Sequence, residues 1–273
     1  MPLPEPCDVL HISPAARPGL SISCSSPDIL PGHNTLTRAY ELYAQASSYA
    51  PALSIRLEKG IPAGSGLGGG SSDAATLLLY LNAQAPRALA PDLLAQVAAS
   101  TGADVPFFLQ KSICRVRGIG DILEPCSTSL AHMQLVLLCP EISVSSAWAY
   151  KVWDASPAAL ALSAQERLTN AKLEAKEMNF CAHGLQNDLE TVVFAAWPKL
   201  KELKLELLQQ GAEAAVMSGS GASLVGLFAD PKKARDVAVF FGAQGLRVYC
   251  RPLVAQADGT NSAFCPCGTN TGV

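Results

Sequence analysis

A glycine-rich segment at residues 62–72 carries the clearest chemical information in this sequence. It reads Pro62-Ala63-Gly64-Ser65-Gly66-Leu67-Gly68-Gly69-Gly70-Ser71-Ser72. Glycine permits positive φ angles and lets a backbone come close to a ligand, so successive N–H groups can converge on an anion. The serine hydroxyls can bind phosphate oxygens or a magnesium ion. The segment therefore predicts a phosphate-binding loop, and a flexible glycine linker is the alternative.

Two common nucleotide-binding motifs do not fit this loop. The P-loop motif ends in Gly-Lys-Ser/Thr, whereas Gly70 is followed by Ser71 with no lysine. The dinucleotide-binding fingerprint needs an acidic residue at the end of a second strand, and none lies at the expected distance. The loop is therefore expected to bind phosphate in another way.

An acidic residue and a second glycine-serine loop complete the candidate site. Asp104 precedes the apolar run 105–108. Such neighbours would remove water from the carboxylate and suit it to accepting a proton, although a helix cap or an ion-paired loop acid explains it equally well. The second loop is Ser218-Gly219-Ser220-Gly221-Ala222-Ser223. It could add donors to a phosphate or pack as a tight turn against the first loop.

The elements that must position these residues follow from hydrophobic periodicity and from capping residues. We expect strands over 7–12, 20–24, 53–57, 114–116, 134–138, 224–228 and 247–251, and helices over 34–46, 72–81, 91–100, 163–176, 198–210 and 231–241. The helix over 72–81 would direct its N-terminus, with Ser72 and Asp73 at its start, toward a phosphate on the loop. Interleaved strands and helices favour an α+β protein. We place the boundary between an N-terminal domain, residues 1–129, and a C-terminal domain, residues 130–273, in the stretch 127–132.

Composition narrows the function classes. The 273 residues are 49 % hydrophobic and 16 % charged, which allows a substantial core. The net charge is −3 and no long Lys/Arg run occurs, so neither nucleic acid nor an anionic membrane is an expected partner. We find no membrane-spanning run and no signal peptide. The nine cysteines form no C-x-x-C pair, so we expect reduced thiols and assign no metal-ligating residues. We also expect a cytoplasmic protein that is a monomer or a homodimer.

Taken together, the segments resemble the GHMP kinases, the superfamily of galactokinase, homoserine kinase and mevalonate kinase. The likeness rests on residues 60–75, 102–107, 118–121 and 216–222, with weaker matches at Asn34, 38–39, 144–146, Tyr150 and 187–190. It covers about residues 8–253. The triple glycine followed by Ser71-Ser72, together with Gly-Ala-Asp-Val-Pro at 102–106, is most similar to the branch that phosphorylates diphosphocytidyl-methylerythritol.

The resemblance implies a two-domain GHMP kinase fold, with a ribosomal-protein-S5-like N-terminal domain and a ferredoxin-like C-terminal domain. It implies an active site between the domains, where the γ-phosphoryl group of ATP, bound with Mg²⁺, passes to a hydroxyl of a small-molecule substrate. Asp104 aligns with the catalytic aspartate of the family, and loop 62–72 with its ATP-phosphate loop. The substrate side would include Asp104, Tyr150, Gly219, Ser220 and Gly221.

One departure from the family concerns the first strand. Family members begin with a strand reading roughly Pro-Ala-Lys-apolar-Asn-apolar and a Gly-Tyr-His turn, whereas residues 7–12 already resemble a later strand. The lysine that partners the aspartate is therefore missing, and no motif places Lys59 on Asp104. His11 and His33 are in the wrong context to replace the Tyr-His pair. We expect either a true first strand upstream, or a short protein with an unpaired sheet edge that is a weak kinase or a nucleotide-binding pseudokinase.

Overall fold

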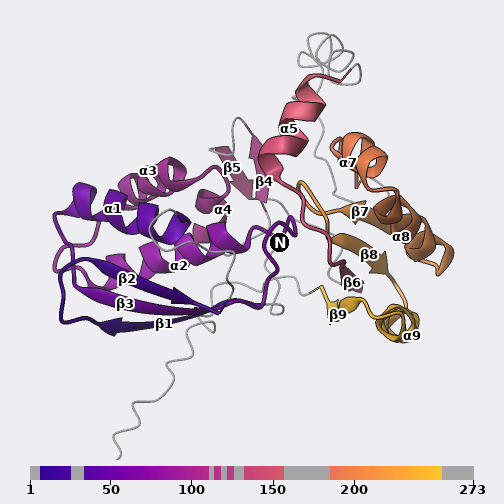
Figure 1. The fold of residues 1–273 in the computed structure, drawn as a ribbon, viewed down its shortest axis with the longest axis horizontal. Coiled ribbons are helices and arrows are strands. Elements are labelled where there is room, and N and C mark those ends of the chain that lie inside the picture. The colour runs from indigo at the N-terminus through magenta and orange to yellow at the C-terminus, as the bar shows by residue number, and fades with distance from the viewer. Residues whose placement is uncertain are drawn as a thin grey trace, which may run out of the picture.

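The computed structural model describes residues 7–25, 34–110, 114–117, 122–125, 132–156 and 185–253. Two groups of elements lie beside one another, the N-terminal group in indigo to magenta and the C-terminal group in pink, orange and yellow (Figure 1). The predicted boundary at residues 129 and 130 lies outside the described residues. So do the predicted helix over 163–176 and the segment 118–121.

The N-terminal group is a small sheet covered by helices on one face (Figure 1). Its elements are β1 (Val9–Pro14), β2 (Leu20–Cys24), α1 (Thr35–Ser47), β3 (Leu53–Glu58), α2 (Gly69–Gln84), α3 (Pro91–Thr101) and α4 (Val105–Leu109). Strand β3 lies in the centre, antiparallel to β1 and parallel to β2. A two-stranded antiparallel ribbon follows, formed by β4 (Cys114–Arg117) and β5 (Ile122–Pro125).

Local sequence explains why these elements form where they do. Strand β3 alternates, with Leu53, Ile55 and Leu57 buried against the helices. Helix α1 begins after Asn34, whose side chain accepts a hydrogen bond from Thr37 N at 2.9 Å. Its buried face consists of the four predicted residues Leu36, Ala39, Tyr40 and Tyr43.

The C-terminal group is a four-stranded antiparallel sheet with helices. Its elements are β6 (Gln134–Cys139), α5 (Ser146–Asp154), α7 (Glu190–Ala196), α8 (Pro198–Gln209), β7 (Ala214–Met217), β8 (Leu224–Phe228), α9 (Pro231–Ala243) and β9 (Arg247–Pro252). The strand order is β7-β8-β6-β9. A strand, helices, two strands, a helix and a last strand follow one another, which is the succession of a ferredoxin-like unit. The predicted α+β two-domain fold is confirmed.

The C-terminal sheet is buried on both faces. Val136 and Leu138 of β6 join the core under the helices, whereas Leu135 and Leu137 join a second cluster on the opposite face. Leu67 of the glycine-rich loop packs against that second cluster. The loop is therefore held from both halves of the molecule.

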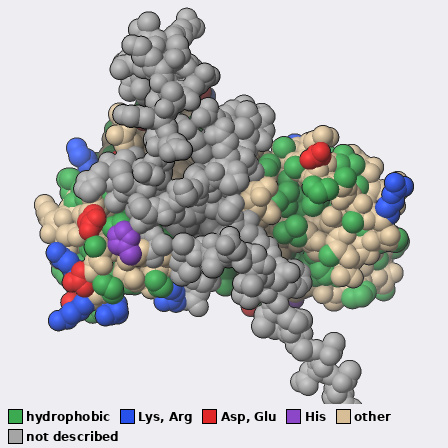
Figure 2. Space-filling view, turned by 180° about the vertical axis from the view of Figure 1, so that it is seen from behind, with side chains coloured by type: hydrophobic (Ala, Val, Ile, Leu, Met, Phe, Trp, Pro, Cys, Tyr) green, Lys and Arg blue, Asp and Glu red, His purple; other side chains and the backbone are tan. Residues whose placement is uncertain are grey.

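Several elements differ from the predictions. Helix α2 begins at Gly69 rather than Ser72, because Gly68, with φ of 70°, takes the N-cap position. The sequence does not predict the short elements α4, β5, α5, α7 and β7, whereas β2 and β8 have the predicted bounds. No helix of the described residues is long and apolar enough to cross a membrane. On the face seen in Figure 2, the described Lys and Arg side chains lie singly or beside acidic ones and form no broad basic patch.

Candidate active site

A cavity of 850 Å³ lies where the two groups of elements meet. Ten of the eleven residues of loop 62–72 line it, and Ser72 does not. Asp104, Tyr150, Gly219 and Ser220 line it as well, whereas Gly221 does not. Eight further lining residues are not among the predicted site residues: Asn34, Thr35, Leu36, Leu57, Lys59, Asp73, Ala103 and Ser146. The structure thus brings together most of the predicted site.

The glycine-rich loop adopts a conformation that requires glycine. Gly64, Gly66 and Gly68 have φ angles of 66°, 73° and 70°, in the left-handed region that side chains disfavour. The first hydrogen bond of helix α2 runs from Ser72 N to Gly68 O at 2.9 Å. The N–H groups before it, those of residues 69–71, have no acceptor within the helix. They lie at the positive end of the helix dipole, which favours an anion at this point.

The second loop packs directly against the first. Ser218 Oγ donates a hydrogen bond to Gly66 O at 3.0 Å, and Ser223 N donates to Ser65 O at 3.0 Å. A Cβ atom on Gly66 would lie 2.1 Å from Ser218 O, so only glycine allows this approach. Of the two expectations for this loop, packing against the first loop is confirmed.

The Ser65 hydroxyl is the one buried side-chain oxygen among the described residues that has no hydrogen-bond partner. Leaving such a group unpaired costs about 1–3 kcal/mol. The loop also offers the N–H groups of residues 69–71, which have no acceptor within helix α2. A phosphate oxygen in the cradle would satisfy this hydroxyl, and the residues present therefore fit a phosphate group.

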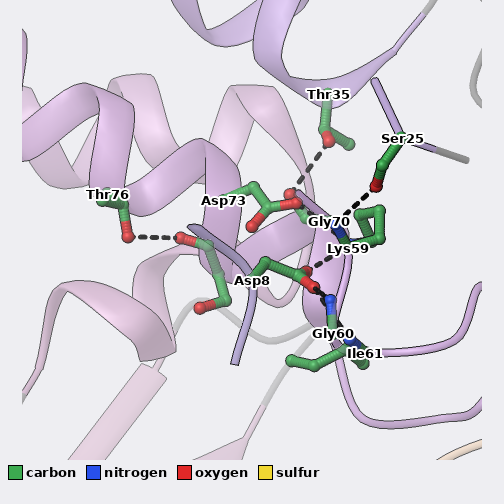
Figure 3. A network of polar contacts seen from close by, with 10 residues as sticks. Asp8, Ser25, Thr35, Lys59, Gly60, Ile61, Gly70, Asp73 and Thr76 are labelled. Carbon is green, nitrogen blue, oxygen red and sulfur yellow. Dashed lines mark hydrogen bonds and ion pairs between the residues drawn. The ribbon is translucent and has the colours of Figure 1, made fainter. Parts of the chain in front are cut away.

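A buried ionic network lies beside both ends of the glycine-rich loop (Figure 3). Lys59 Nζ forms ion pairs with Asp8 and with Asp73, the second at 3.2 Å. Asp8 Oδ1 also accepts hydrogen bonds from Gly60 N and Ile61 N, both at 2.8 Å. The backbone that enters the loop is thereby tied to β1 and to helix α2.

The protonation of this network depends on its burial. Only 4 % of the Asp73 side chain and 9 % of the Lys59 side chain are exposed. Burial raises the pKa of Asp73 to about 7, the Lys59 ammonium acts against this rise, and the Asp8 carboxylate adds to it. The Asp73 carboxyl group, which directly follows the glycine-rich loop, therefore titrates near neutral pH.

Asp104 lies at the N-terminal end of α4 and is exposed in the cavity. The expectation that apolar neighbours remove water from its carboxylate is wrong, because Val105 and Pro106 are buried while Asp104 is not. It also caps no backbone N–H, and it forms no ion pair within the described part of the chain. The carboxylate is thus accessible to a molecule in the cavity.

Helix α5 forms the opposite wall of the cavity. Tyr150 is 57 % exposed and lines it. Ser146 Oγ lies 2.7 Å from Ser220 Oγ, which joins this helix to the second loop. Sequence reasoning did not identify Lys59 and Asp73 as site residues, although both flank the loop closely in the sequence.

Comparison with known proteins identifies the family. The model of the GHMP kinase N-terminal domain matches residues 34–112, and that of the GHMP kinase C-terminal domain matches residues 164–245. A 4-diphosphocytidyl-2-C-methyl-D-erythritol kinase of Nitratidesulfovibrio vulgaris is 42 % identical over 91 % of this chain and 87 % of that protein. A protein of the same name from Solidesulfovibrio magneticus is 43 % identical, over 93 % and 86 % of the two chains.

Solved structures agree with this result. A crystal structure of 4-(cytidine 5'-diphospho)-2C-methyl-D-erythritol kinase superposes with a TM-score of 0.65 at 29 % identity, over 89 % of this chain and 85 % of the other. A homoserine kinase from Cytophaga hutchinsonii gives a TM-score of 0.67 at 19 % identity, over 91 % and 87 % of the two chains, and shares the fold alone. The chain therefore belongs to the GHMP kinase family, within the group of the 4-diphosphocytidyl-2-C-methyl-D-erythritol kinases.

Proposed function

We propose that this protein transfers the γ-phosphoryl group of ATP to the 2-hydroxyl of 4-diphosphocytidyl-2-C-methyl-D-erythritol, a step of the non-mevalonate route to isoprenoid precursors. The observation that carries this proposal is one cavity that holds both an anion-binding glycine loop and the exposed carboxylate of Asp104. The identity of about 40 % to kinases of that name supports the choice of alcohol.

The phosphates of ATP would bind at the start of helix α2. The N–H groups of residues 69–71 and the Ser65 hydroxyl are the donors that the loop offers. Phosphoryl transfer depends mainly on positioning and on stabilisation of charge, with little covalent chemistry for the protein to do. Rigid backbone donors suit this task because they need not reorganise during the reaction.

Mg²⁺ would neutralise part of the phosphate charge when bound with ATP. The described residues contain no group of three or more His, Cys, Asp or Glu side chains that could hold a metal. Mg²⁺ commonly keeps several waters and uses one or two protein groups plus substrate phosphates. The Ser71 hydroxyl, in the first turn of α2 and on the cavity wall, is the protein ligand that we propose.

Asp104 would act as the general base. The 2-hydroxyl oxygen attacks the γ-phosphorus, the bond from that phosphorus to the bridging oxygen of ADP breaks, and the hydroxyl proton passes to the Asp104 carboxylate. Because the carboxylate is exposed in the cavity, it can reach the acceptor hydroxyl. The substrate side of the site would include Tyr150, Gly219, Ser220 and Gly221. Gly221 does not line the cavity and would contribute only by shaping the second loop.

A second candidate function is nucleotide binding with weak or no turnover. Among the described residues that line the cavity, Lys59 is the only Lys or Arg, and both Asp8 and Asp73 hold its ammonium group. The lysine that partners the aspartate in the family resemblance has no counterpart there. Under this reading ATP binds without transfer of phosphate.

Feeding the purified protein Mg-ATP and one alcohol at a time separates these functions. We expect phosphorylation of 4-diphosphocytidyl-2-C-methyl-D-erythritol and not of homoserine or mevalonate. Phosphorylation of homoserine alone would contradict the proposed substrate. A cytoplasmic location, a monomer or homodimer, and a domain division at residues 129 and 130 stay predictions.

A further inference from the structure

Two polar residues behind the second loop bind its backbone. Asn187 Nδ2 donates hydrogen bonds to Met217 O at 2.8 Å and to Gly219 O at 2.7 Å. Glu190 Oε1 accepts a hydrogen bond from Met217 N at 2.8 Å. Asn187, which precedes α7, and Glu190, the first residue of α7, thus hold the point where strand β7 ends and the loop begins.

The two side chains are themselves fixed. Asn187 Oδ1 accepts a hydrogen bond from Leu189 N at 3.0 Å. The other carboxylate oxygen of Glu190 forms an ion pair with Lys204 of helix α8, in which both side chains are largely buried. Each polar side-chain atom of Asn187 and Glu190 thus has a partner, so the two side chains have one well-defined geometry.

The second loop in turn contacts the backbone of the glycine-rich loop at Gly66. Its hydroxyl at Ser218 donates to Gly66 O, and a Cβ atom on Gly219 would lie 2.9 Å from the same oxygen. The conformation of the glycine-rich loop around Gly66 therefore depends on where the second loop lies.

We propose that Asn187 and Glu190 are positioning residues for the ATP-phosphate site, a role that rests on the proposed function. Neither residue lines the cavity. They act by holding the second loop against the glycine-rich loop, so that the N–H groups at the start of α2 keep the spacing that phosphate needs.

The affinity for Mg-ATP, measured by calorimetry on the full chain without any alcohol, tests this role. Asn187→Ala removes two hydrogen bonds to the loop, and we expect the dissociation constant for ATP to rise about tenfold. Glu190→Ala should weaken binding as well. Glu190→Gln should retain more affinity than Glu190→Ala, because its amide oxygen can still accept from Met217 N, although it loses the ion pair with Lys204.

A purely structural role would give another pattern. Val237→Ala removes methyl groups from the core beneath α9 and serves as the matched control. It should lower the melting temperature and leave the dissociation constant for ATP unchanged. If the loss of affinity followed the melting temperature across all four variants, the positioning role would be refuted.

The remaining outcomes are distinct. A folded Asn187→Ala variant with wild-type ATP affinity overturns the inference and leaves the proposed function intact. If that variant does not fold, equal affinities for Glu190→Ala and Glu190→Gln overturn it instead. A wild-type chain that binds no ATP overturns the proposed function and this inference together.

Discussion

Gly66→Ala is the perturbation that tests the contact between the two loops most sharply. Gly66 has a φ of 73°, and its Cβ atom would lie 2.1 Å from Ser218 O and 2.7 Å from Gly221 O. A left-handed backbone costs a residue other than glycine about 1–2 kcal/mol. Overpacking adds typically about 1–3 kcal/mol, and backbone atoms cannot rotate away as a side chain can.

The expected loss is therefore about 2–5 kcal/mol of unfolding free energy, a large part of the stability of an ordinary domain. If the loops separate to relieve the clash, part of this loss appears instead as weaker binding of ATP. Urea unfolding followed by circular dichroism measures the first quantity, and calorimetry with Mg-ATP measures the second.

Gly242→Ala is the matched control. Gly242 lies in helix α9, and no heavy atom is within 4 Å of the Cβ that alanine would add. Alanine in a helix is favoured over glycine by roughly 0.5–1 kcal/mol, so this variant should be slightly more stable than the wild type. A Gly66→Ala variant with wild-type stability and wild-type ATP affinity would refute the packing of the two loops.

Three further predictions concern the polar groups of the site. Ser65→Ala should raise the unfolding free energy of the ligand-free protein by about 1 kcal/mol or more, because it removes a buried hydroxyl that has no partner. It should also weaken ATP binding, because the same hydroxyl is a proposed donor to phosphate; lower stability with unchanged affinity would contradict both expectations. The pKa of Asp73 is about 7 in the folded protein against an ordinary 3.8, so the folded state holds the extra proton between these values. The unfolding free energy of the wild type relative to Asp73→Asn should therefore fall as the pH rises from 4 to 7, by at most about 1.4 kcal/mol per pH unit. If urea titrations give the same difference in unfolding free energy at pH 5 and at pH 8, the pKa of Asp73 is not raised. Asp104→Asn should keep ATP affinity nearly intact and reduce kcat by roughly a hundredfold or more; unchanged turnover in a steady-state assay would remove Asp104 from the mechanism.

Elements with local signals could be predicted from the sequence. Helix α1 follows the N-cap Asn34, and α3 begins with Pro91, a residue favoured in the first turn. Ser72 and Asp73 resemble capping residues and predict a start at Ser72, but helix α2 begins three residues earlier, at Gly69. Gly68 takes the N-cap position, and Phe108 leaves no room for a side chain there, since its ring lies 2.8 Å from the Cβ position.

In the candidate site, too, features set by neighbouring residues are predictable from the sequence, whereas contacts between residues far apart in the sequence are not. The glycine-rich loop and Asp104 follow from short patterns of residues. The ion pairs of Lys59 do not, because Asp8 is 51 residues away and only the pairing of β1 with β3 brings it close. The exposure of Asp104 also depends on the fold, since packing buries the apolar residues that follow it and leaves the carboxylate in the cavity.

Phosphorus NMR of the protein with Mg-ATP and 4-diphosphocytidyl-2-C-methyl-D-erythritol follows the proposed phosphoryl transfer itself. We expect loss of the γ-phosphate signal of ATP and growth of a phosphomonoester signal without three-bond coupling to a proton, because carbon 2 of the methylerythritol unit carries no hydrogen. Binding of ATP with no phosphomonoester on this alcohol, under conditions where the protein is folded, would contradict it.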